Sequence, residues 1–296
     1  MRLKEIFKIL SDNLNGLNIS VTPLSGTANV RVDRLNQLRV AIYNIEKTGL
    51  FEKDILLLKE MPTFASTLDS LTISSEQNNL LNTSLNNIKN GINVFKDSIS
   101  ENIPIEFSDD IISIKLPNKM DLNDLNKIIE LLKKSLSIPL AEAEINDTIE
   151  INAFESGSYW IDILVHSAEA VSLIAAITWA GAFIHKQYLE AKIHWAYIES
   201  LETKNDHLKD LRENAKKLMD SLVETEAQNL EKDYYKEVDP ERTKRLILAI
   251  ESMSKLIEKG TEVHPNLLAS ENLKSAFPSF KNLNQIESKT KQIKNE

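Results

Sequence analysis

Apolar residues recur at helical spacing over much of the N-terminal third of the chain. From Ser75 to Asn102 the interval between them alternates between four and three residues, which is the pattern of a helix with one apolar face. Its members are Leu81, Leu85, Ile88, Ile92, Phe95 and Ile99. We expect this helix to pack in a bundle within one chain, because intermolecular coiled coils usually sustain the pattern for about three or four heptads.

Shorter helices are predicted before this segment. Residues 1–10 are amphipathic, a helix is expected over 33–47, and a further helix over 51–59 ends before Pro62, since a residue that precedes proline disfavours helical geometry. The stretch 15–32 contains two glycines and a proline. Such turn-forming residues predict a surface loop there.

The pattern becomes β-like after Pro104. Residues 111–116 and 149–153 alternate between apolar and polar, and 159–165 is a third β-prone run. Apolar residues at helical spacing from Leu125 to Leu136 lie between the first two strands. The order predicts a β-α-β-β module over residues 104–167, in which three strands form a small mixed sheet that carries the helix on one face.

The segment Ala170–Ile184 contains no charged side chain. As a helix its 15 residues span roughly 22 Å, which is less than the roughly 30 Å of a bilayer's hydrocarbon core. Extending the helix upstream brings in Glu169 and Asp162, and Ser167 is well placed to cap it. We therefore expect a helix buried in the core or in an oligomer interface, and we keep a membrane span as the alternative.

Helical signal continues to about residue 230 without a proline. Within it, leucines spaced by three, four or seven residues predict a coiled coil or a long helical hairpin through which the protein assembles. These are Leu208, Leu211, Leu218 and Leu222. A separate helix is predicted from an Asp239 cap and Pro240 to Gly260, which suits a left-handed terminating position. Residues 287–296 are polar and are expected to be disordered.

These elements predict an α+β fold that is predominantly α, with a helical bundle and long coiled-coil-like helices beside a small β-α-β-β sheet. We divide the chain into an N-terminal helical region at 1–103, the sheet module at 104–167, a long-helix region at 168–286 and the tail at 287–296. The scarcity of glycine and proline, 7 and 8 residues, agrees with a helical protein.

The net charge and the cysteine content limit the partners and the kinds of site that the protein can have. The formal net charge of −9 argues against a nucleic-acid partner, because proteins that bind phosphate backbones usually gather Lys and Arg on one face. The absence of cysteine excludes disulfides, thiolate catalysis and Cys-ligated metals. The N-terminus lacks the apolar core of a secretion signal, so we expect a cytoplasmic, bacterial protein, with membrane association as the alternative.

Sequence motifs for catalysis are weak. Glu190 and His194 have one-turn spacing but lack the further ligands of a metal site. The turn around Ser156 lacks the preceding glycine of a nucleophile elbow, and Asp109–Asp110 lacks the spacing of a calcium loop. We therefore predict no catalytic residue, no metal and no cofactor.

The expected function is that of a non-enzymatic interaction or assembly protein that forms a homo-oligomer or binds a protein partner through its long helices. Trp160 and Trp179 are further interaction candidates, although ordinary packing is the favoured explanation because tryptophan is normally well buried in cores. The alternative is a membrane-inserting effector that uses residues 159–184, a layout loosely similar to helical pore-forming proteins with a β-tongue. An enzyme with carboxylates on the small sheet is a third class.

Overall fold

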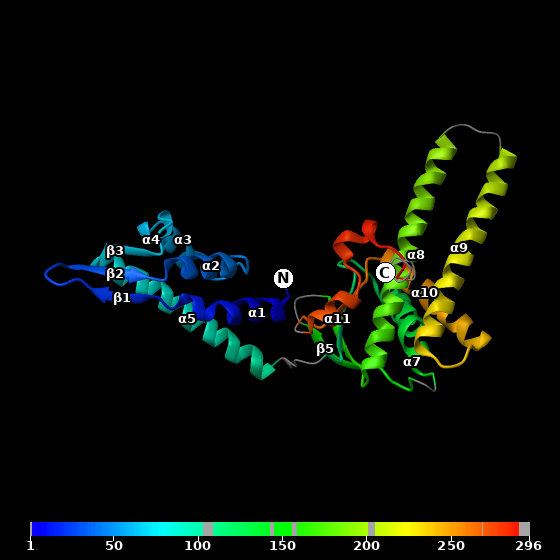
Figure 1. The fold of residues 1–296 in the computed structure, drawn as a ribbon, viewed down its shortest axis with the longest axis horizontal. Coiled ribbons are helices and arrows are strands. Elements are labelled where there is room, and N and C mark those ends of the chain that lie inside the picture. The colour runs from blue at the N-terminus through cyan, green and yellow to red at the C-terminus, as the bar shows by residue number, and fades with distance from the viewer. Residues whose placement is uncertain are drawn as a thin grey trace. The chain divides into compact units, whose positions relative to one another are not determined.

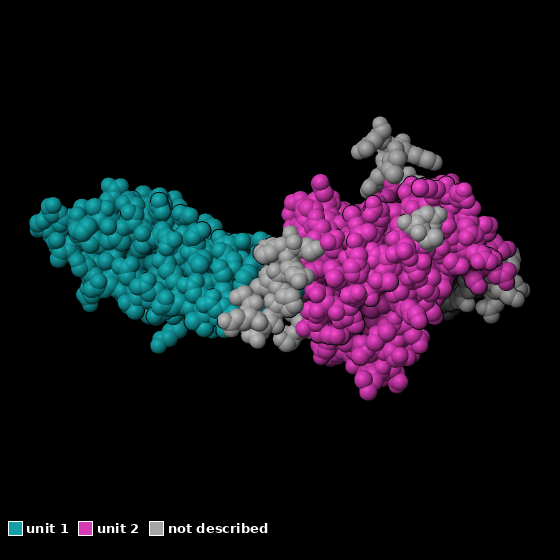
Figure 2. Space-filling model, turned by 90° about the horizontal axis from the view of Figure 1, so that it is seen from below, with its two compact units in different colours: residues 1–106 teal, residues 107–296 magenta. Residues whose placement is uncertain are grey.

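The computed structural model describes residues 2–102, 109–142, 145–155, 159–200, 205–267 and 269–289, without the side chains of 100–102, 155, 197–200 and 205–212. The chain forms two compact units, residues 1–106 and 107–296, which are coloured separately in Figure 2. It is 65% helical and contains two small antiparallel sheets. The predicted α+β, mostly α fold is therefore confirmed.

The first unit wraps short helices and a sheet around one long helix (Figure 1). Its helices are α1 (Leu3–Asn13), the 3-10 turn η1 (Leu14–Leu17), α2 (Leu35–Glu46), α3 (Glu52–Lys59), α4 (Pro62–Ala65) and α5 (Ser75–Asn102). Its strands are β1 (Ser20–Pro23), β2 (Asn29–Asp33) and β3 (Ser70–Ser74), which pair antiparallel in the order β1-β2-β3. The apolar face of α5 is buried in this unit's core, as its spacing predicts.

The loop predicted at 15–32 is wrong, because most of that stretch forms the hairpin of β1 and β2. Val30 and Val32 on β2 are buried, while Arg31 between them is exposed, so the strand alternates as a half-buried strand does. Gly26 supplies a positive φ of 75° between the strands. The strands are only four or five residues long and gain their third partner, β3, from a distant segment, so local periodicity did not reveal them.

The second unit joins a sheet to long helices. Its elements are β4 (Ile111–Lys115), α6 (Leu122–Leu132), the π-helical turn η2 (Lys133–Ser137), α7 (Ile138–Leu140), β5 (Glu150–Glu155), β6 (Trp160–Leu164), α8 (Ala168–Ser200), α9 (Asn205–Tyr234), α10 (Pro240–Glu258), β7 (Glu262–Pro265), α11 (Glu271–Ala276) and the 3-10 turn η3 (Phe280–Gln285). The sheet order is β5-β6-β4-β7, and all of its pairs are antiparallel.

The strand-helix-hairpin order predicted from the sequence is present, with two corrections. The sheet is antiparallel throughout and not mixed, and it gains a fourth strand, β7, from beyond α10. Its apolar face shares one core with α8, α9 and α10. The two compact units differ from the predicted four-part division, since described residues on both sides of the predicted boundary at 167/168 share this common core.

The apolar segment Ala170–Ile184 forms the first half of α8 and is largely buried in that core. Among the described residues, Ala168–Ala196 is the one helix long and apolar enough to cross a membrane, and 78% of its most apolar window is buried inside the unit. Gly181 lets α10 approach closely, because a Cβ there would lie 2.5 Å from Cγ of Met253. Helix α8 thus packs as a core helix in this structure.

Candidate functional site

The candidate site is the part of the α8–α9 hairpin that extends past α10. Helix α10 packs against both α8 and α9, and ends at Glu258 with a positive φ of 88° at Gly260, as predicted for the terminating position (Figure 1). Where α10 ends, a cavity of about 520 Å³ opens between the three helices. Its lining includes Tyr188 and Trp195 of α8 and Met219 of α9.

Apolar side chains are exposed on the hairpin next to this cavity. The exposed fractions are 47% for Tyr188, 45% for Leu189, 69% for Ile193 and 62% for Leu218, and we call these four residues the distal hairpin surface. Ile184, one turn before Tyr188, is fully buried. Tyr188 and Leu189 line the cavity opposite the last two turns of α10, whereas Ile193 and Leu218 are not part of its lining.

Charges of both signs line the cavity. Lys192, Lys216 and Lys255 lie there together with Glu251 and Glu258. This mixed lining presents no net field of one sign, so it permits an approach of a second surface of the same composition.

Two titratable groups of the cavity are shifted by burial. Burial lowers the pKa of His185, and the nearby Glu258 carboxylate offsets this only in part. Burial raises the pKa of Tyr188, and the charges of Glu251 and Asp220 add to that shift. His185 and Tyr188 are therefore both held toward their neutral forms, as expected of groups that line a partly dry helix junction.

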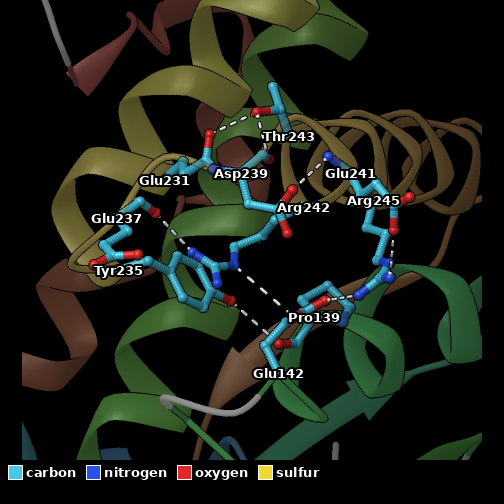
Figure 3. Close-up of polar contacts among 10 residues, drawn as sticks. All are labelled: Pro139, Glu142, Glu231, Tyr235, Glu237, Asp239, Glu241, Arg242, Thr243 and Arg245. Atoms are coloured by element: carbon cyan, nitrogen blue, oxygen red, sulfur yellow. Dashed lines mark hydrogen bonds and ion pairs between the residues drawn. The ribbon is translucent and has the colours of Figure 1, made fainter.

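The base of the hairpin is fixed by a polar network at the turn between α9 and α10 (Figure 3). Glu231 is buried and accepts hydrogen bonds from the backbone N–H of Asp239, at 2.8 Å, and from the hydroxyl of Thr243, at 2.5 Å. The Asp239 carboxylate caps α10 by accepting from Glu241 N at 2.9 Å, and Pro240 occupies the first turn. The predicted start of this helix is confirmed.

Arg242 connects the same turn to the segment around α7. Its guanidinium donates to the Glu237 carbonyl at 2.8 Å, lies 4.4 Å from the ring centroid of Tyr235, and approaches the Glu142 carboxylate at 3.8 Å. Figure 3 shows that Arg245 reaches the same carboxylate from the next turn of α10. The turn from which α9 and α10 diverge is thus tied to the sheet side of the unit, which gives the hairpin a rigid base.

The start of α8 is fixed by Asp147, a buried carboxylate. It accepts from the Ser167 hydroxyl at 2.7 Å, from His166 N at 3.0 Å and contacts His166 Nδ1 at 3.1 Å. Ser167 in turn accepts from Ala170 N at 3.2 Å, which confirms the predicted cap. Because the Ser167 hydroxyl donates to Asp147 and not to His166, the three residues do not form the relay of a serine hydrolase.

The predicted interaction leucines divide between different environments. The structure does not describe the side chains of Leu208 and Leu211. Leu218 belongs to the distal hairpin surface, and Leu222 packs against the unit's core. The buried face of α9 runs through Met219, Val223, Ala227 and Leu230. Three- and four-residue spacing identified an apolar helix, but it could not assign each leucine to the core side or the outer side.

The two predicted tryptophans occupy separate surroundings. The indole N–H of Trp179 donates to the Glu287 carbonyl at 2.9 Å, and Lys289 Nζ lies 4.6 Å from its ring centroid. Trp160 on β6 packs against His264, with ring centroids 5.4 Å apart and ring planes tilted by 45°. Their role in partner binding stays a prediction.

The contacts of Trp179 correct the predicted tail, since residues 287–289 are packed. The Ser288 hydroxyl donates to Glu226, a buried carboxyl whose pKa burial raises. Residues 290–296 lie outside the described part of the chain.

Glu190 and His194 have the one-turn spacing of a pair of metal ligands. Within the described ranges, no three His, Asp or Glu side chains are grouped to hold an ion. Glu190 instead approaches Lys186 at 3.7 Å.

Comparisons with known proteins add one relative. No protein-family model matches the chain, and no solved structure matches it. The chain is similar to the uncharacterized protein YqaP of Bacillus subtilis (strain 168), with 26% identity over 288 residues, which cover 94% of this chain and 92% of YqaP. The aligned length exceeds that of either unit, so the similarity extends over both.

Proposed function

We propose that the protein is a non-enzymatic, cytoplasmic interaction protein that assembles with a second copy of itself through the distal hairpin surface. The observation that carries the proposal is the exposure of four large apolar side chains on the α8–α9 pair, two of which, Tyr188 and Leu189, line the cavity beside α10. Several large apolar side chains exposed near charged groups are typical of protein interaction sites. Nucleic acid is not a partner in this proposal, in keeping with the net charge of −9.

The hairpin of a second copy can cover the apolar side chains that the first hairpin leaves exposed. Near its base, the α8–α9 pair is covered by α10, and in the part of the chain that the structure describes the two helices extend past α10 as a pair (Figure 1). Two such pairs packed side by side form a four-helix bundle, in which each pair covers the apolar face of the other. Because the lining carries both lysines and glutamates, a two-fold arrangement can place opposite charges together.

The fixed base favours the same proposal. The Glu231 and Arg242 contacts hold the α9–α10 turn, and the Asp147 contacts hold the start of α8. A hairpin that is ordered before binding loses less conformational entropy when a partner packs on it. Association through a pre-ordered surface therefore requires less apolar burial than association through a disordered segment.

The test is the mass of the protein in solution, measured by sedimentation equilibrium. We expect an oligomer for the native chain and a monomer for the variant that carries Ile193→Glu and Leu218→Glu. Val238→Glu is the matched control, because Val238 is 69% exposed but lies in the α9–α10 turn. A native chain that is monomeric at high concentration, or a double variant with unchanged mass, would contradict the proposal.

A second candidate function is that of a membrane-inserting effector that uses residues 159–184. It is favoured by Phe154 and Tyr159, which flank the β5–β6 turn and are 69% and 52% exposed. It requires α8 to leave a core in which it is largely buried. Flotation with vesicles and release of an entrapped dye test it: protein that stays unbound and leaves the vesicles intact would eliminate this candidate.

A further inference from the structure

A second cavity lies in the sheet half of the unit, away from the hairpin. It has a volume of about 690 Å³ and is bounded by α6 and the turn η2 on one side and by β4, β5 and β6 on the other. Ile114, Leu136 and Ile163 belong to its lining and are buried, so it reaches down to the core. We call it the apolar groove. Its size is in the range of small-molecule sites, roughly 300–1,000 Å³.

The groove exists because α6 leaves one strip of the sheet uncovered. Ile151 and Phe154 of β5 pair with Ile163 and Ile161 of β6, and paired residues project from the same face. The register shift between Ile151 and Ala153 is what brings both apolar residues to that face. They are 61% and 69% exposed, whereas their partners on β6 are buried.

The lining contains few polar groups, and its charge is positive. Lys133 is the single charged residue in the lining, at the π-helical turn that precedes Pro139. It forms no ion pair with any residue that the structure describes. A ligand with a long apolar part and one anionic group therefore matches the groove, because its apolar part removes the exposed strip from water and its charge lies near the ammonium.

An added strand fits the groove less well. It would have to pair with β5, the edge strand, but the bulge in β5 and the exposed Glu150 discourage strand addition. A flexible hydrocarbon chain needs no strand edge to pair with.

From these observations we infer that the apolar groove binds a single-chain anionic amphiphile, a long-chain carboxylate, with its head group beside Lys133 and its chain between α6 and β5. The hydrocarbon chain of this ligand contacts Leu116, which follows β4, and Ile129 of α6, and it covers Phe154. This site is separate from the distal hairpin surface, since the two linings share no residue.

The test is a calorimetric titration of the intact protein with dodecanoate below its micellar concentration, where we expect saturable binding. Replacing two exposed residues together, Ile151→Glu and Phe154→Glu, lowers the affinity at least about tenfold. Val238→Glu, an equally exposed position elsewhere in the unit, leaves it unchanged. Absence of saturable binding, or binding that survives the double replacement, would overturn the inference.

The head group is tested with a matched pair of lysines. Lys133→Gln is expected to lower the affinity for dodecanoate about fivefold, because an exposed ion pair contributes modestly to binding. The affinity for dodecanol, which has no charge, is expected to stay the same. Lys134→Gln, at the neighbouring exposed residue outside the lining, changes neither. Equal losses from both variants would contradict the assignment of Lys133. Protein that floats with phosphatidylglycerol vesicles but does not bind dodecanoate would replace a monomeric ligand by a bilayer surface.

Discussion

Arg242 stacks on the ring of Tyr235 at 4.4 Å, and the Tyr235 hydroxyl donates a hydrogen bond of 3.2 Å to the Pro139 carbonyl. Through these two side chains the turn between α9 and α10 is joined to α7, about a hundred residues earlier in the chain. Both side chains are buried. A long helical hairpin gains a fixed direction only if its base is held in this way.

Removal of Arg242 therefore destabilises the second unit more than removal of its neighbour. Arg242→Ala is expected to lower the free energy of unfolding by about 3 kcal/mol, because it leaves a partly buried carboxylate without one partner. Arg245→Ala, at a 44% exposed side chain bound to the same Glu142, costs under about 1 kcal/mol. Urea unfolding followed by tryptophan fluorescence measures both, since all 3 tryptophans lie in the second unit. Equal losses would contradict this ranking.

The close contact at Gly181 predicts that Gly181→Ala lowers the stability of the unit, whereas helix propensity alone would predict a gain. In an exposed helix, Gly→Ala stabilises by roughly 1 kcal/mol. At Gly181 the new Cβ would meet Met253 and the backbone nitrogen of Ser254, so we expect Gly181→Ala to destabilise the unit by about 1–3 kcal/mol. The same urea measurement decides the sign, and a gain in stability would show that α8 and α10 can separate freely.

The contact between Asp147 and His166 predicts a pH dependence with two limits. The hydrogen bond and charge of Asp147 raise the pKa of His166, so its stabilising contribution is complete below about pH 6.5 and is lost as pH rises through the raised value. For Asp147, burial opposes ionisation but hydrogen bonds from Ser167 and His166 outweigh it and lower its pKa, so its contribution is lost only in strong acid.

The measurement is the difference in unfolding free energy between the native chain and His166→Gln from about pH 5.5 to about pH 8.5, which is from about one unit below to about two units above the ordinary histidine pKa. We expect the native advantage to shrink as pH rises. The difference isolates His166 from His185, whose burial lowers its pKa and whose protonation in acid acts with the opposite sign. A constant difference across the window would contradict the assignment.

The two cores predict separate responses to core truncation. Ile88 of α5 belongs to the core of the first unit, and no residue is shared with the core of the second. Ile88→Ala is expected to lower the stability of the first unit by about 3 kcal/mol while the tryptophan-reported transition stays in place. Circular dichroism and fluorescence followed in one titration separate the two transitions, and a joint shift would show that the units unfold as one.

The sequence predicted the elements whose signals are local. The face of α5 has a repeating apolar spacing, and α10 begins at Asp239–Pro240 and ends at Gly260, each with its own cap. Strands β1, β3 and β7 are four or five residues long and are stabilised by partners far along the chain, so no local pattern revealed them.

Which residues form the candidate surfaces depends on tertiary packing even more strongly than the formation of the short strands does. Leu218 and Leu222 have the same spacing relationship as any pair one turn apart, yet the first is exposed and the second packs on the core. Their difference is one of helix face, since Met219, next to Leu218, is buried on the core side of α9. Likewise Phe154 points into the apolar groove only because of the register shift in β5, which the alternation of the sequence did not indicate.

The central claim is that the distal hairpin surface faces a second copy of the chain. Since the chain has no cysteine, Lys192→Cys gives a single site for a nitroxide label on α8, and Lys53→Cys gives a control site in the first unit. Pulsed dipolar spectroscopy is predicted to give a discrete distance between copies for the label at position 192, which Ile193→Glu abolishes. Absence of dipolar coupling at position 192 in a sample of the native oligomer would contradict the account.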